Sequence, residues 1–275
     1  MKRFVVLVCV ASATMTPAML FRFFEWDASP LLETAIFGAA VLAAGFMLSW
    51  GAEAAENYVS QGLILAVVAL ITVLPEYAID LYYAFQAGRA PESNYVHYAA
   101  ANMTGANRLL VGLAWPLMLL LHWWRTRNRA ITLAPVNVIE IVFLLIASLY
   151  AFVILFKNRI DLLDFIVLVS IFGAYLWQVG RVPKMDSDHE DEVVSDKINQ
   201  WTLLVGMLPL AMSFGASSII ALPLDARQHE EFFLTAAQSL FALSLLIRLR
   251  FALWAASVLM ALFYRAGHDC ICVSQ

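Results

Sequence analysis

Charged residues are scarce in this sequence. Asp, Glu, Lys and Arg make up only 14% of its 275 residues, whereas about 25% is usual in soluble domains. Hydrophobic residues account for 62%, and the mean hydropathy is +0.77. A soluble fold has too little interior to hide so much apolar surface. The composition therefore predicts an integral membrane protein.

Several other features are absent. The net charge is −4 and there is no basic stripe, which argues against nucleic acid as a partner. No H-E-x-x-H, G-x-S-x-G or P-loop motif occurs, and the histidines are scattered, so we do not expect an enzyme. The cysteines, at positions 9, 270 and 272, lack the C-x₂₋₄-C spacing of metal sites.

Long apolar runs are what the sequence has instead. A helix needs roughly 20 apolar residues to cross a bilayer core, and the runs are continuous, as in helices, rather than alternating, as in barrel strands. We therefore predict an all-α, polytopic fold of about nine transmembrane helices. They cover residues 4–21, 34–53, 61–86, 98–121, 137–156, 162–180, 199–222, 232–247 and 249–264. The last two form either a tight hairpin, which we favour, or one long bent element.

The first apolar run has two interpretations. Lys2-Arg3, the apolar run and Ala11-Ser12-Ala13 are typical of a secretory signal with its cleavage site. The run continues past that site through Met19-Leu20-Phe21, which favours a retained span. With all spans retained, the side of the amino terminus holds ten Lys and Arg and the opposite side holds six, if Arg108 within a span is set aside. The positive-inside rule then places the amino terminus in the cytoplasm of a multi-pass cell-membrane protein.

The third span is the most informative, because it carries acids inside an apolar helix. Thr72, Glu76 and Asp80 repeat every four residues, which places a hydroxyl and two carboxylates on one stripe. Pro75 lacks a backbone donor and so frees a carbonyl in the preceding turn. Hydroxyl, carboxylate and carbonyl oxygens are the ligands that Ca²⁺ and Na⁺ prefer. This stripe therefore predicts a cation site.

A carboxylate in a low dielectric also favours its protonated form, so one oxygen can exchange a proton for a metal ion. Such competition for a single site is the basis of antiport. The alternative is that Glu76 and Asp80 form a buried ion pair with Arg108, or that Asp80 lies at the membrane interface near its neighbouring tyrosines. Acids inside a membrane are functional by default, which favours the cation site for Glu76.

The fourth span opens with small residues and amides, Ala99 to Asn107. Small residues let helices approach closely. Asn102 and Asn107 are about 140° apart around a helix, so both cannot point at one ion. We expect Asn102 to be the ligand, with Asn107 capping or packing.

The stretches Leu70–Glu76 and Ala101–Asn107 resemble the first α-repeat of the cation/calcium exchanger superfamily, which includes sodium/calcium and calcium/proton antiporters. The usual form is G-T-S-x-P-E followed by G-N-x-x-G-S-N. The positions that match are Thr72, Pro75, Glu76, Asn102, Gly105 and Asn107, while Ile71, Val73, Ala101 and Ala106 depart. The resemblance implies Glu76, Thr72 and Asn102 as ion ligands, with helix breaks at Pro75 and Gly105.

The family is built from two inverted repeats of five helices. By this resemblance, residues 1–33 are an extra span and loop, 34–180 the first repeat, 181–197 an acidic linker and 198–275 a partial second repeat of three helices and a tail. The stretch Ser195–Gly206 resembles the second helix of the second α-repeat, yet no P-E helix precedes it. The partner carboxylate is thus absent, and Asn199 and Gln200 are the ligands that remain.

The sequence therefore predicts a membrane cation antiporter that exchanges Ca²⁺ or another cation for Na⁺ or H⁺ through Glu76, with inorganic cations as its partners in a lipid bilayer. We expect no cofactor besides the transported ion. The alternative is a transport-impaired relative that binds or regulates a partner. The missing helices make self-association, or association with a full-length exchanger, a further expectation.

Overall fold

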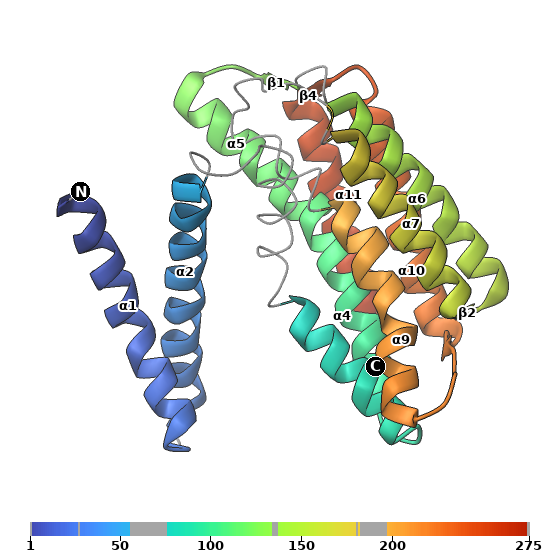
Figure 1. The fold of residues 1–275 in the computed structure, drawn as a ribbon. Coiled ribbons are helices and arrows are strands. Elements are labelled where there is room, and N and C mark those ends of the chain that lie inside the picture. The colour runs from blue at the N-terminus through green and yellow to red at the C-terminus, as the bar shows by residue number, and fades with distance from the viewer. Residues whose placement is uncertain are drawn as a thin grey trace. The chain divides into compact units, whose positions relative to one another are not determined.

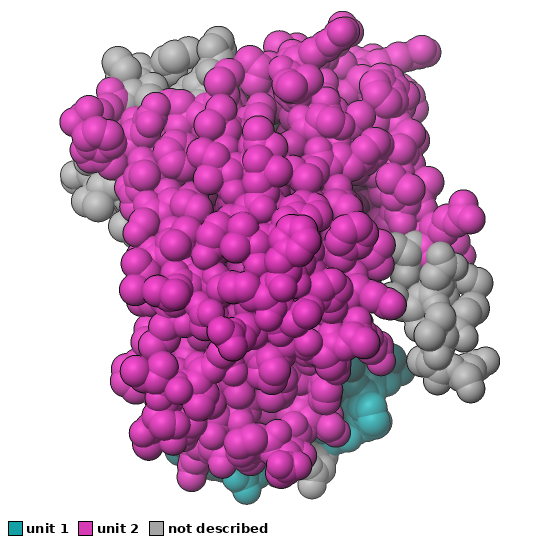
Figure 2. Space-filling model, turned by 90° about the vertical axis from the view of Figure 1, so that its right-hand side faces the viewer, with its two compact units in different colours: residues 1–72 teal, residues 73–275 magenta. Residues whose placement is uncertain are grey.

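The computed structural model describes residues 2–26, 28–55, 76–133, 137–179, 181 and 197–273. The chain divides into two compact units, Met1–Thr72 and Val73–Gln275, which Figure 2 colours separately. In the first unit, helices α1 (Lys2–Phe23) and α2 (Pro30–Ala55) pack against each other. Thr72 and Pro75 fall among residues 56–75, and most of the acidic linker falls among residues 182–196. Both ranges lie outside the described residues.

The second unit is a bundle of helices (Figure 1). Its elements are a helix described from residue 76 to 89, α4 (Tyr95–Leu109), the π-helix η1 (Leu110–Ala114), α5 (Trp115–Thr126), α6 (Asn137–Lys157), α7 (Leu162–Val179), a helical turn at 197–199, the π-helix η3 (Gln200–Leu204), α9 (Val205–Ala216), α10 (Ala226–Leu246) and α11 (Leu253–Val273). Four strands of two or three residues join them: β1 (Ala130–Thr132), β2 (Arg159–Ile160), β3 (Leu222–Pro223) and β4 (Arg250–Ala252).

The strands make two small antiparallel pairs at opposite ends of the helical unit (Figure 1), β1 with β4 and β2 with β3. Each pair ties the loop after one helix to a loop far away in sequence. The β1–β4 pair also shows that α10 and α11 are separate helices, parted by a turn and a strand. One long bent helix is therefore excluded, and each of the two packs chiefly on other helices, α10 on α6 and α4, and α11 on α5.

Among the described residues, five helices are long and apolar enough to cross a membrane. They cover Phe4–Phe23, Pro30–Met47, Tyr95–Thr126, Asn137–Lys157 and Leu162–Val179, and each coincides closely with a span predicted from the sequence. The span expected at 199–222 is shorter as a helix, because α9 ends at Ala216. There the Ser213 hydroxyl donates to the Ile220 carbonyl oxygen at 3.1 Å, which turns the remaining apolar residues toward β3.

Helix α6 shows how these helices suit lipid. Large apolar side chains at a spacing of three or four residues are exposed on one face, namely Val142, Leu145, Leu149, Val153 and Phe156. The opposite face buries small and polar residues, among them Ala147, Ser148 and Ala151. A helix whose outward face is its apolar face fits a hydrocarbon surrounding, in which polar groups must be satisfied inside the protein.

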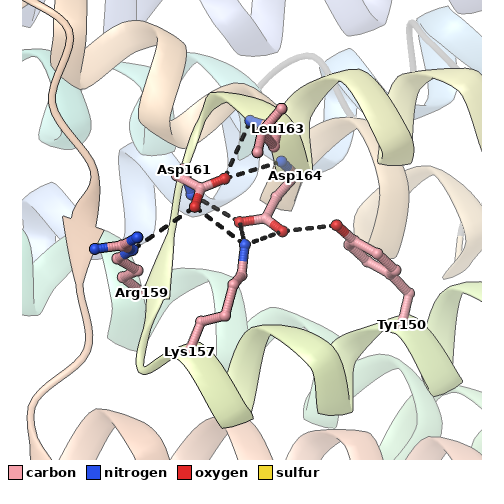
Figure 3. A network of polar contacts seen from close by, with 6 residues as sticks. All are labelled: Tyr150, Lys157, Arg159, Asp161, Leu163 and Asp164. Carbon is pink, nitrogen blue, oxygen red and sulfur yellow. Dashed lines mark hydrogen bonds and ion pairs between the residues drawn. The ribbon is translucent and has the colours of Figure 1, made fainter.

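A polar network around the buried Asp164 fixes the turn between α6 and α7 (Figure 3). Asp164 is fully buried, and its carboxylate accepts hydrogen bonds from the Tyr150 hydroxyl and the Lys157 ammonium, each at 2.7 Å. Asp161 caps α7 by accepting from the backbone N–H of Asp164 at 3.2 Å. Because α7 packs on η3 and α9, this turn helps to position the segment that carries the candidate site.

Candidate cation site

Glu76 is the first described residue of its helix, and its carboxylate faces the start of η3. Gln200 Nε2 donates a hydrogen bond to Glu76 Oε2 at 3.0 Å. The other carboxylate oxygen, Oε1, is buried and has no hydrogen-bond partner among the described residues. One amide thus holds one oxygen of this acid and leaves the second free.

Asp80 repeats this arrangement one turn further along the helix. Its side chain is fully buried, and Asn102 Nδ2 of α4 donates to Asp80 Oδ1 at 2.7 Å. Asp80 Oδ2 is buried and unpartnered. Asp80 therefore lies inside the protein and not at an exposed interface, and within the described part of the chain neither acid forms an ion pair with Arg108.

Asn199 lies next to Gln200 and is 1% exposed. Its backbone carbonyl accepts a hydrogen bond from the Tyr77 hydroxyl at 3.3 Å, which ties the two acid-bearing turns to the start of η3. Both polar atoms of the Asn199 side chain, and Gln200 Oε1, are buried without a partner. Four buried side-chain oxygens on Glu76, Asp80, Asn199 and Gln200 are therefore unsatisfied.

Unsatisfied buried polar atoms are rare in folded proteins, because each loses its hydration without compensation. Several such atoms also occur elsewhere among the described residues, but these four oxygens lie on two helical segments that contact each other through the Gln200–Glu76 and Tyr77–Asn199 hydrogen bonds. Oxygen ligands of this kind suit hard cations such as Na⁺ and Ca²⁺. The arrangement can hold a small cation between the helix at 76–89 and the start of η3.

Asn107 belongs to a neighbouring cluster. Its backbone oxygen and its side-chain Oδ1 accept hydrogen bonds from the Lys197 ammonium at 2.8 and 2.7 Å. Lys197 is fully buried and lies over the Trp201 ring, 5.6 Å from its centre. Lys197 was one of the ten Lys and Arg counted in loops on the side of the amino terminus, and its full burial shows that this placement was wrong. The sequence signal for this burial was the four-residue spacing between Lys197 and Trp201, which puts both on one face of a helix.

Two π-helical turns lie at the site and at the neighbouring cluster. η1 begins three residues after Asn107, and η3 begins at Gln200. Single π turns inside α-helices frequently mark functional sites, because they shift the register of the following side chains. The expected helix break at Gly105 differs from the structure, since α4 runs through Gly105 without interruption and the irregular turn comes at η1.

Thr72 and Pro75, the other expected members of the site, lie outside the described residues. Within the described part of the chain, no group of three or more His, Cys, Asp or Glu is placed to hold a metal ion. The described part of the site consists of two carboxylates and amides.

Comparisons with known proteins agree with this architecture. The family model described as sodium/calcium exchanger protein matches residues 30–180, and no curated protein matches the chain. A solved structure described as "Crystal Structure of H+/Ca2+ Exchanger CAX" is 30% identical with a TM-score of 0.86, over 94% of this chain and 86% of that chain. This multi-pass helical membrane protein therefore belongs to the sodium/calcium exchanger family of cation antiporters.

Proposed function

We propose that this protein exchanges Ca²⁺ or another cation for Na⁺ or H⁺, and that Glu76 and Asp80 hold the ion within the membrane. The observation that carries the proposal is the group of four unsatisfied buried oxygens on Glu76, Asp80, Asn199 and Gln200. A bound cation would supply the partner that these oxygens lack. The family and the H⁺/Ca²⁺ exchanger likeness support a transporter over an enzyme.

The geometry supports a single site that two ions share in turn. Each carboxylate has one oxygen fixed by an amide N–H, from Gln200 or Asn102, so the other oxygen is oriented without being occupied. That oxygen can take a proton or a metal ion, but not both. Because binding of one expels the other, the two fluxes are coupled.

Further ligands and the orientation complete the proposal. We propose Asn199 as the amide ligand from the second half of the chain, and the family resemblance adds the hydroxyl of Thr72, which lies outside the described residues. Asn107 Oδ1 accepts a hydrogen bond from Lys197, so we do not assign Asn107 as an ion ligand. With Lys197 removed from the loop charges, the positive residues number nine against six, which still favours a cytoplasmic amino terminus in the cell membrane.

The test is cation flux in liposomes that contain the purified protein. Under an imposed H⁺ or Na⁺ gradient, we expect uptake of ⁴⁵Ca²⁺ or ²²Na⁺ that Glu76→Gln abolishes. Glu230→Gln makes the same chemical change at an exposed residue of α10 and should leave the flux intact. Absence of flux for every cation tried would contradict the proposal, and copurification with a full-length exchanger would then favour a regulatory role.

A further inference from the structure

A pocket lies at the β1–β4 end of the helical unit (Figure 1). Its volume is about 680 Å³, and three arginines line it: Arg129 before β1, Arg248 in the turn before β4, and Arg250 at the start of β4. Trp123 of α5 and Trp254 of α11 line it as well. Positive charges and aromatic rings therefore share one pocket, and none of them belongs to the proposed cation site.

The strand pair holds the arginines at this pocket. In its register Ile131 lies opposite Phe251, and both side chains are buried. Because side chains alternate between the two faces of a strand, Arg250 beside Phe251 faces away from the core. The backbone carbonyl of Arg129 accepts a hydrogen bond from the Leu253 N–H at 3.0 Å, which ties it to the start of α11. Backbone hydrogen bonds, and not ion pairs, thus keep the arginines in place.

The positive charge of the pocket has no counter-charge within the described part of the chain. There, Arg129, Arg248 and Arg250 form neither an ion pair nor a side-chain hydrogen bond, and all three are exposed. The sequence around them explains this, because residues 93–139 and 232–268 contain neither Asp nor Glu. Three guanidinium groups are therefore available to an anionic ligand.

The chemistry of the lining suits the headgroup region of a bilayer. Guanidinium groups bind phosphate through paired N–H donors, and tryptophan is enriched at the level of the lipid headgroups. Basic pockets between transmembrane helices on the cytoplasmic side bind the headgroups of anionic lipids, and the orientation proposed above places this end in the cytoplasm. Leu245 and Leu253, which also line the pocket, offer acyl chains an apolar surface beside the arginines.

We propose that this pocket binds an anionic phospholipid, with the headgroup phosphate on Arg129, Arg248 and Arg250 and the acyl chains along Leu245 and Trp254. Unpaired arginines favour anionic lipids over zwitterionic ones, because only the anionic lipids bring a net negative charge. The inference goes beyond the proposed transport function and does not depend on which ion is carried.

The experiment is native mass spectrometry of the full chain in a neutral detergent, titrated with phosphatidylglycerol and with phosphatidylcholine of the same acyl chains. We expect the wild type to bind phosphatidylglycerol about tenfold or more tightly. The triple variant Arg129→Gln, Arg248→Gln and Arg250→Gln should lose this preference. Arg159→Gln makes the same change on the opposite strand pair, where the arginine lies 3.7 Å from Asp161, and should keep the preference.

Size-exclusion profiles check that the triple variant folds. If it does not, the single variants carry the test, and each should lower the affinity for phosphatidylglycerol about fivefold. The inference is overturned if the wild type binds both lipids equally, or if the arginine variants keep the wild-type preference.

Two other occupants are distinguished by further titrations. If inorganic phosphate displaces the lipid at equal concentration, a free anion is the ligand and the inference is overturned. The other occupant is the chain's own acidic segment, residues 186–196, whose Asp and Glu are changed together to Asn and Gln. Lipid binding that occurs only in this variant would assign the pocket to the acidic segment, whereas unchanged binding supports the lipid.

Discussion

Gly88 lies where the helix at 76–89 crosses α9 with almost no space between the backbones. A Cβ at this position would lie 2.0 Å from the carbonyl oxygen of Met212. Gly215 makes the reciprocal contact, since its Cβ would lie 2.0 Å from the Phe85 carbonyl oxygen. Real Cβ contacts are not shorter than 3.0 Å, so Gly88→Ala must move one backbone by about 1 Å.

Overpacking of this kind costs about 1–3 kcal/mol. Alanine also favours the helix over glycine by up to about 1 kcal/mol, so the matched control is Gly173→Ala in α7, where nothing lies within 4 Å of the added Cβ. Both variants gain the same propensity, and their difference reports the clash. For a unit of this size we expect the Tm of Gly88→Ala to be about 2–12 °C below that of the control.

The assay is intrinsic-fluorescence unfolding of the detergent-purified variants during heating. Equal Tm values for Gly88→Ala and Gly173→Ala would refute the close crossing of the two backbones. A higher Tm for Gly88→Ala would refute it more strongly, because alanine would then have filled space that the structure does not contain.

Further predictions concern the polar groups. Asp164→Asn removes the buried charge that its neighbours surround and should cost about 1–3 kcal/mol in thermal unfolding, whereas Arg159→Gln, at an exposed side chain, should change little. Burial raises the pKa of Asp161, but the Lys157 ammonium and a backbone N–H lower it by a larger amount. The pKa of Asp161 therefore lies below the ordinary 3.8. The carboxylate then stabilises the fold above about pH 3.8 and loses this effect as pH falls through the lower folded pKa. Plots of stability against pH for the wild type and for Asp161→Asn should therefore converge at low pH. Asn102→Leu releases Asp80 Oδ1 and should weaken cation binding about tenfold in titrations without lowering Tm by more than a few degrees.

Sequence reasoning located the helices best where an apolar run was long and uninterrupted. The span expected at 137–156 is α6, Asn137–Lys157, and the span expected at 162–180 is α7, Leu162–Val179. The span predicted at 199–222 extended six residues too far, because hydrophobicity alone does not distinguish a helix from the apolar loop and strand that follow Ala216. The π turns carry no sequence signal that separates them from α-helix.

The candidate site was likewise predictable from the sequence only in part. The four-residue spacing of Glu76 and Asp80 already placed them on one stripe, and the structure brings Asn102 and Gln200 to them. Which amide reaches which acid depends on how the helices cross, and spacing along one helix cannot specify that. Lys197 was misplaced because a lysine at the end of an acidic segment is usually solvated, whereas here two oxygens of Asn107 on α4 and the Trp201 ring on its own helical segment surround it.

The most direct test of the central claim is cation binding to the double variant Glu76→Gln with Asp80→Asn. Titration calorimetry with Na⁺ and with Ca²⁺ should show binding of at least one of these ions to the wild type and to the surface variant Glu230→Gln. The account predicts that the double variant binds neither ion, because amides replace both buried carboxylates. Unchanged affinity in the double variant, with the protein folded, would contradict the account.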